Sequence, residues 1–144
     1  MIAQAIGRWG NFMNVEAYGE TTTLPWRMGI MQDDGSFIYV HPTFLYESLW
    51  NLIGFILINL LYKNKKFDGH ICLCYFTWYG FGRMFIESLR TDSLYLFGSG
   101  IRVSQLIGAV AFAAGIILIV IFSVKSRKTV DTVKTEAEET KVIE

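Results

Sequence analysis

The feature that most constrains this chain is residues 103–124, an apolar stretch without Asp, Glu, Lys, Arg or His. It is longer than the roughly 18 apolar residues that identify a helix able to cross the hydrocarbon of a bilayer. The whole chain has 144 residues and a mean hydropathy of +0.35, which agrees with a membrane protein. Its 13 basic and 13 acidic side chains balance, which argues against a nucleic-acid binder because such proteins carry an excess of positive charge.

Two further segments are long enough to span a bilayer. Residues 43–62 carry one charge, Glu47, close to one end. Residues 71–90 are rich in aromatic side chains but contain Arg83 and Glu87. Each of these two charges costs about 2.5 to 3.5 kcal/mol at the bilayer centre, so another group must compensate them. We therefore predict an all-α integral membrane protein with three transmembrane helices.

Two clusters of cationic residues set the predicted orientation. The first follows residues 43–62 and the second follows residues 103–124, and the positive-inside rule places both in the cytoplasm. The residues before His41 are then extracytoplasmic, and residues 71–90 run back outward. Residues 125–144 have few apolar side chains, so we expect a disordered cytoplasmic tail. The clusters are Lys63, Lys65 and Lys66, followed by Lys125, Arg127 and Lys128.

One face of the middle span is polar. Tyr79, Arg83 and Glu87 are four residues apart and Arg90 follows three later, a spacing that puts all four on one side of a helix. Two arginines against one carboxylate leave positive charge, which predicts an anion site. Lipid phosphate is the nearest abundant anion and matches the guanidinium fork. The alternative is a structural ion pair between Arg83 and Glu87 that a neighbouring helix covers.

The N-terminal residues combine glycines with polar side chains. Residues 2–6 predict a helical piece too short to span, and residues 7–19 predict a polar loop whose glycines allow close approach to a ligand. By the predicted topology this loop lies on the same outer side as Arg90 and His41, so we expect one compartment to hold Arg8, His41, Glu47, Arg83 and Arg90. His41 precedes a proline, so it is either a helix-entry residue or a catalytic one, and both interpretations stay open.

Two smaller features complete the pattern. Residues 21–40 contain the turn sequence Asp33, Asp34, Gly35 between two apolar segments, which predicts a small extracytoplasmic β-hairpin. Cys72 and Cys74 have no His or acidic cluster at metal-ligand spacing. They therefore predict buried apolar thiols and no metal site, and no cofactor is expected.

Three motifs carry a family resemblance. They read Gly-Arg-x-Gly-Asn-Phe-x-Asn-x-Glu-x-x-Gly at residues 7–19, His-Pro-Thr-x-Leu-Tyr-Glu at 41–47 and Tyr-Gly-x-x-Arg-x-x-x-Glu-x-x-Arg at 79–90. These motifs resemble the bacterial prolipoprotein diacylglyceryl transferase family. The resemblance covers residues 1–124, which we expect to form the membrane-embedded transferase core, the C-terminal part of the family fold.

The resemblance implies a multi-pass transferase of the bacterial inner membrane with its active side extracytoplasmic. Such an enzyme moves diacylglyceryl from phosphatidylglycerol to the lipobox cysteine thiol in the signal peptide of a preprolipoprotein and releases glycerol phosphate. This is the first step of bacterial lipoprotein maturation. The candidate catalytic residues are Arg8, His41, Arg83 and Glu87. The candidate residues for phosphatidylglycerol binding are Arg8, Asn11, Asn14, Glu16, Gly19, Tyr79, Arg83 and Arg90.

The implied reaction requires positive charge near the leaving phosphate and a base for the thiol proton. Positive charge on Arg8 and Arg83 suits the developing charge of the departing phosphate. A base must take the thiol proton, because the thiolate is the nucleophile. His41 has the more suitable unperturbed pKa and Glu87 the better motif position, so both remain candidates.

Family members also have several earlier spanning helices and a His-Gly-Gly loop, neither of which precedes residues 7–19 here. We therefore expect this polypeptide alone to lack transferase activity, and a complementing N-terminal half to restore it. The competing interpretation is a non-enzymatic protein that binds anionic lipid, or a transporter fragment with the polar stripe as its lining.

Overall fold

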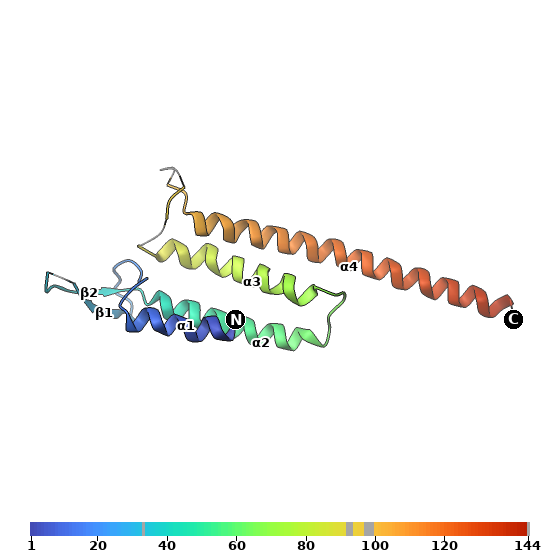
Figure 1. Ribbon diagram of the computed structural model, residues 1–144, viewed down its shortest axis with the longest axis horizontal. Coiled ribbons are helices and arrows are strands. Elements are labelled where there is room, and N and C mark those ends of the chain that lie inside the picture. The colour runs from blue at the N-terminus through green and yellow to red at the C-terminus, as the bar shows by residue number, and fades with distance from the viewer. Residues whose placement is uncertain (33, 92–93, 97–99, 144) are drawn as a thin grey trace.

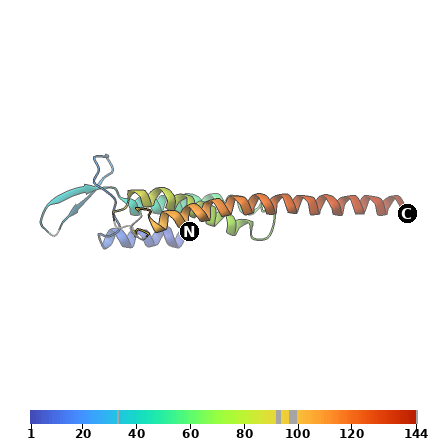
Figure 2. The ribbon, with the colours of Figure 1, turned by 90° about the horizontal axis from the view of Figure 1, so that it is seen from above.

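The computed structural model describes residues 1–32, 34–91, 94–96 and 100–143. Figure 1 shows α2, α3 and α4 side by side, with the strands projecting from one end of the helices. Figure 2 shows that α1 lies to one side of these three helices. The elements in chain order are helix α1 (Ile2–Met13), strands β1 (Met28–Met31) and β2 (Phe37–Val40), helices α2 (Thr43–Tyr62) and α3 (His70–Ile86), the 3-10 helix η1 (Glu87–Leu89) and helix α4 (Val103–Ile143).

Two helices are long and apolar enough to cross a membrane. They are α2, over Thr43–Tyr62, and the part of α4 over Val103–Thr129. Helix α3 has 17 residues, slightly short of the usual length of a span, and it includes Arg83. The prediction of a mostly helical architecture with a small sheet is therefore confirmed, and the third span stays a prediction.

The predicted β-hairpin is present. Strands β1 and β2 are antiparallel, with Met28 opposite Val40 and Met31 opposite Phe37. In the turn, the Ser36 amide donates to Asp34 Oδ1 at 2.8 Å, and hydrogen bonds from Ser36 lower the pKa of Asp34. Asp33, the first residue of the predicted turn sequence, lies outside the described residues.

Helix α1 is longer than the sequence predicted. It continues to Met13, so residues 7–13 of the expected polar loop are helical. A Cβ at Gly7 or Gly10 would meet no atom within 4 Å, so neither glycine serves a close approach in this chain. The prediction failed because glycine lowers helix propensity by only about 1 kcal/mol, a penalty that packing of Ala5 against a neighbouring helix outweighs.

Helix α4 also continues further than expected, to Ile143. The backbone of residues 125–143 is therefore helical, where a disordered tail was expected. Extending an existing helix needs no new nucleation, and the Lys, Glu and Ala residues of this segment are good helix formers. The division of the chain at residue 124 and the cytoplasmic position of the tail stay predictions.

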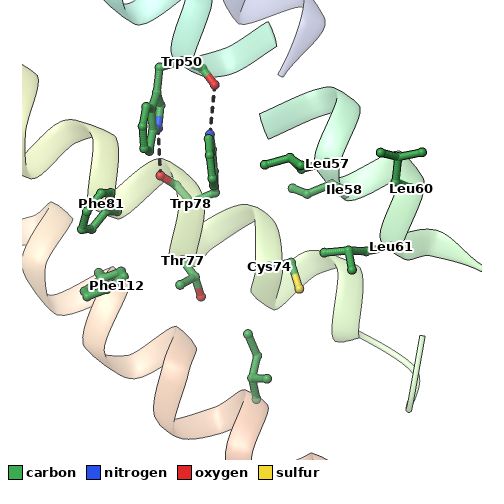
Figure 3. A pocket seen from close by; sticks show the side chains of 11 residues that line it. Trp50, Leu57, Ile58, Leu60, Leu61, Cys74, Thr77, Trp78, Phe81 and Phe112 are labelled. Carbon is green, nitrogen blue, oxygen red and sulfur yellow. Dashed lines mark hydrogen bonds between the residues drawn. The ribbon is translucent and has the colours of Figure 1, made fainter. Parts of the chain in front are cut away.

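A pair of tryptophans fixes how α2 lies against α3. The rings of Trp50 and Trp78 are stacked, with centroids 4.2 Å apart and planes 13° apart. Each indole donates to the backbone carbonyl of the other residue, at 3.1 and 3.0 Å (Figure 3). A Cβ at Gly82 would collide with the Trp50 indole, and one at Gly54 with the Trp78 indole. The two glycines therefore make room for the pair and set the register of the helices.

Helices α3 and α4 approach each other through small residues. A Cβ on Gly108 would lie 2.8 Å from the carbonyl oxygen of Gly80. One on Gly115 would collide with the Thr77 hydroxyl. Small residues are the usual means of close helix contact in membranes, so this pair agrees with packing in a bilayer.

Substituting Gly82→Ala tests the tryptophan pair. The added methyl must displace the Trp50 indole, so we expect the free energy of unfolding to fall by about 1 to 3 kcal/mol, as for other overpacked sites. The measurement is denaturant unfolding of the chain in detergent micelles. Gly7→Ala is the matched control, because it adds the same methyl to a helix in open space. Equal unfolding of the two variants would contradict this account.

Candidate functional site

Glu47 lies near the start of α2, at the hairpin end of the helices, and is 4% exposed. Helix α2 begins at Thr43, immediately after Pro42. The Thr43 hydroxyl donates to the Ala17 carbonyl oxygen and so ties the start of the helix to the chain that follows α1. This local structure places the Glu47 carboxylate between α1 and α3.

Three guanidinium groups surround this carboxylate. Arg8 Nε lies 2.7 Å from Glu47 Oε2, while Arg83 Nη1 lies 3.1 Å from Oε1. Arg90 Nη1 is 3.9 Å from the same Oε1. Arg83 Nη2 also lies 2.7 Å from Glu87 Oε2. We call Arg8, Arg83, Arg90, Glu47 and Glu87 the arginine cluster, and its three cations against two anions leave one positive charge in excess.

The excess charge is most accessible at Arg8. The side chains of Glu47 and Arg83 are 5% and 15% exposed, but that of Arg8 is 25% exposed. Arg83 directs both terminal nitrogens to carboxylates. Arg8 contacts Glu47 through Nε, and its two terminal nitrogens make no hydrogen bond with the residues that the structure describes. A planar fork of donors is therefore available for an anion.

Contacts between α1 and its neighbours hold Arg8 in place. The Ser48 hydroxyl donates to the Ala5 carbonyl oxygen at 2.9 Å and accepts from Trp9 Nε1 at 3.3 Å. Gln4 Nε2 donates to the Tyr75 hydroxyl at 3.1 Å, which connects α1 to α3. Arg8 lies between Gln4 and Trp9 in sequence, so these contacts fix its backbone on both sides.

Gly19 brings the connection after α1 against the end of η1. Its amide donates to the His41 carbonyl oxygen at 3.0 Å, and it faces Arg90 in an isolated antiparallel bridge. A Cβ here would lie 2.6 Å from the Cβ of His41 and 2.8 Å from the Leu89 carbonyl oxygen. Only glycine fits this approach, and the predicted role of Gly19 in lipid binding stays a prediction.

His41 is near the cluster in backbone position, but its ring has other partners. Its Nδ1 lies 3.2 Å from the Tyr46 hydroxyl. That hydroxyl in turn accepts from Trp26 Nε1 at 2.9 Å. The imidazole is therefore paired with Tyr46 rather than with the arginines.

The remaining predicted residues lie around the cluster. Asn14 Nδ2 donates to Glu16 Oε1 at 3.1 Å, and both side chains are exposed on the turn after α1. The Asn11 carbonyl oxygen accepts from the Glu16 amide at 3.0 Å. Tyr79 lines a small cleft together with Glu47 and Arg83. The structure thus brings together Arg8, Arg83, Glu87 and Arg90, as predicted, and keeps His41, Asn14 and Glu16 out of the ion pairs.

The sequence analysis placed Glu47 in the same compartment as the arginines but did not include it among the candidate site residues. Two signals could have found it, since it is the one charge in an otherwise apolar span and the last residue of the motif at 41–47. The predicted meeting of Arg8 and Arg83 is observed, but through Glu47 as their shared partner. The ion pair between Arg83 and Glu87, offered as the alternative, is present as well.

A second, larger cleft is apolar. It has a volume of about 480 Å³ and lies between α2, α3 and α4, where Figure 3 shows its lining side chains. Thr77 and Cys74 are its most polar side chains, and no charged residue lines it. This cleft can accommodate hydrocarbon but offers no charged group to an anion.

No metal site emerges in the described part of the chain, where no group of three His, Cys, Asp or Glu side chains could hold an ion. Cys72 is exposed and Cys74 is partly exposed, so the prediction of buried thiols was wrong for Cys72. The reason is that α3 turns this side chain away from the neighbouring helices of this chain.

Fold and cluster together define a mostly helical protein with two helices able to span a membrane and a cluster of arginines and carboxylates at one end of them. Comparison with known proteins makes this class specific. A family profile described as prolipoprotein diacylglyceryl transferase matches residues 1–121, and the chain belongs to that family. The resemblance seen in the three motifs is therefore confirmed.

Similar proteins carry the name phosphatidylglycerol--prolipoprotein diacylglyceryl transferase. The one from Clostridioides difficile (strain 630) is 50% identical over 90% of this chain and 49% of its own length. That from Enterococcus faecalis (strain ATCC 700802 / V583) is 50% identical over 84% of this chain and 46% of its own length. That from Streptococcus pneumoniae (strain Hungary19A-6) is 51% identical over 83% of this chain and 47% of its own length. The chain thus spans about half the length of the curated relatives it matches.

Substituting Ser48→Ala tests how Arg8 is held. The change removes the hydroxyl that bridges Ala5 and Trp9, so we expect a loss of about 1 kcal/mol in the contact between α1 and α2. Amide hydrogen exchange in nanodiscs should then show faster exchange in α1 and unchanged exchange in α3. Thr129→Ala, which removes a hydroxyl bonded only within α4, is the control. Unchanged protection of α1 would contradict the assignment.

Proposed function

We propose that this chain acts in the transfer of diacylglyceryl from phosphatidylglycerol to the lipobox cysteine thiol of prolipoproteins. The observation that carries the proposal is the pair of terminal Arg8 nitrogens, which make no hydrogen bond within the described residues, beside five residues with one positive charge in excess. A phosphodiester is a singly charged anion with two free oxygens, which suits such a fork. The names of the similar proteins support the same pair of substrates.

The reaction makes one bond and breaks one. The thiol sulfur attacks the glyceryl carbon that carries the phosphate, and the carbon–oxygen bond breaks as the carbon–sulfur bond forms. Glycerol phosphate leaves with the bonding electron pair, and the thiol proton passes to a base. Negative charge grows on the departing phosphate, so a preorganised guanidinium at Arg8 stabilises the transition state more than the ground state.

Two candidates for the proton acceptor remain, His41 and Glu87. Glu87 is 2% exposed and lies 2.7 Å from Arg83, which leaves it little access to a substrate thiol. His41 is partly exposed and its ring contacts a hydroxyl, so it is open to a second molecule. These observations favour His41 over Glu87 among the residues of this chain.

We further propose that α2, α3 and α4 all span the membrane, with the hairpin and the arginine cluster outside. Helix α3 runs between the two apolar helices, and at 1.5 Å per residue its 17 residues reach about 25 Å. The cluster at its C-terminal end would then lie at the level of the outer headgroups. The cationic residues at 63–66 and 125–128 lie at the opposite end.

Cysteine labelling in cells tests this topology. Ser36→Cys, Gly100→Cys and Asn64→Cys are made singly, with Cys72 and Cys74 replaced by Ser. A membrane-impermeant maleimide should label the first two variants in intact cells and the Asn64 variant only after permeabilisation, because positions 64 and 100 flank α3. Labelling of both flanks from the same side would rule out a third span.

Substituting Arg8→Lys tests phosphate binding by the fork. Lysine keeps the charge but loses the planar pair of donors, so we expect the transfer rate to fall at least about tenfold, equivalent to about 1.4 kcal/mol. The assay follows transfer from phosphatidylglycerol to a lipobox peptide, with the chain co-expressed with the N-terminal half of the Clostridioides difficile relative. Arg27→Lys on the exposed hairpin is the control. An unchanged rate for Arg8→Lys would remove the basis of the proposal.

A further inference from the structure

We infer that Glu47 is a positioning residue for the transfer reaction. Its carboxylate holds the Arg8 guanidinium by Nε and so aims the two terminal nitrogens of Arg8 at the lipid phosphate. This inference rests on the proposed function, because it assigns Glu47 a role through Arg8 rather than through a substrate contact of its own.

The two oxygens of Glu47 have separate partners. Oε2 pairs with Arg8 of α1, and Oε1 pairs with Arg83 of α3 and lies near Arg90. One carboxylate thus connects helices that are far apart in sequence. Because each oxygen is occupied, rotation of the carboxylate would break a pair on one side, and the contact at Nε restrains the position of the Arg8 guanidinium.

Burial keeps Glu47 from acting on the substrate itself. The residue is 4% exposed, whereas the Arg8 side chain beside it is 25% exposed. The backbone carbonyl of Glu47 accepts from Asn51 Nδ2 at 2.8 Å, and Asn51 is 3% exposed. Substrate therefore reaches Arg8 first, and Glu47 acts from behind it.

Neutralising Glu47 has two opposite effects, one on the attraction of the cluster for an anionic lipid and one on the orientation of Arg8. Without its carboxylate, the five residues of the arginine cluster keep three cations and one anion, so the excess positive charge among them rises from one to two. Attraction for an anionic lipid then increases, since Coulomb interaction follows the net charge. The orientation of Arg8 is lost, however, and small misplacement of a catalytic group lowers rates by about 100-fold.

The test compares Glu47→Gln with Glu47→Asp in the co-expressed transfer assay. We expect Glu47→Gln to lower kcat about 100-fold. The KM for phosphatidylglycerol should stay the same or fall, because the excess positive charge is larger. Glu47→Asp keeps the charge one methylene further back, so it should recover part of the kcat. Glu20→Gln, an exposed carboxylate on the same side, is the matched control and should leave both parameters unchanged.

A wild-type kcat in Glu47→Gln would overturn the inference, as would a rise in KM with kcat unchanged. If Glu47→Gln does not fold, as judged by circular dichroism and size-exclusion chromatography, Glu47→Asp decides alone. A wild-type kcat in Glu47→Asp then overturns the inference, and a lowered kcat with unchanged KM supports it. If Arg8→Lys has a normal rate, the proposed function fails; if Arg8→Lys is impaired but Glu47→Gln is normal, only the positioning role fails.

Discussion

The structure depends on how the buried carboxylate of Glu47 is neutralised. A charge at 4% exposure is stable only where opposite charges and hydrogen bonds replace the lost water. Here the compensation comes from three arginines on two other parts of the chain, so α1, α2 and the end of α3 must assemble together. Removal of one partner from such a cluster leaves an uncompensated charge, which is more damaging than the loss of one surface ion pair.

Packing elsewhere in the helices makes this assembly possible. The reciprocal bonds of Trp50 and Trp78, beside Gly82 and Gly54, set the axial position of α2 against α3. Glu47 and Arg83 lie about one turn from this pair, so the register that suits the tryptophans also suits the ion pair. The apolar cleft lies next to the tryptophans, and Trp50 lines both that cleft and the small one beside Arg83. The apolar cleft, which suits hydrocarbon, and the small cleft beside the arginine cluster therefore meet at Trp50.

Much of this arrangement could be predicted from the sequence, for reasons that are local. Apolar length indicated α2 and the first part of α4, and turn residues indicated the hairpin. The spacing of Arg83 and Glu87 placed them on one helical face and offered their ion pair as the alternative to an anion site. The role of Glu47 could not be derived, because it depends on which face of α2 meets α1, and that is set by tertiary contacts such as that of Ser48 with Ala5. Likewise, local propensity suggested a loop after residue 6, whereas packing extends α1 to Met13.

The central claim is that the Arg8 guanidinium binds a lipid phosphate directly. The most direct test is solid-state NMR recoupling between ¹⁵N-arginine side chains of the chain and ³¹P of phosphatidylglycerol in bilayers. The account predicts strong ¹⁵N–³¹P coupling that disappears in Arg8→Gln and persists in Arg27→Gln. Coupling that is absent in the unmodified chain, or that survives Arg8→Gln unchanged, would contradict it.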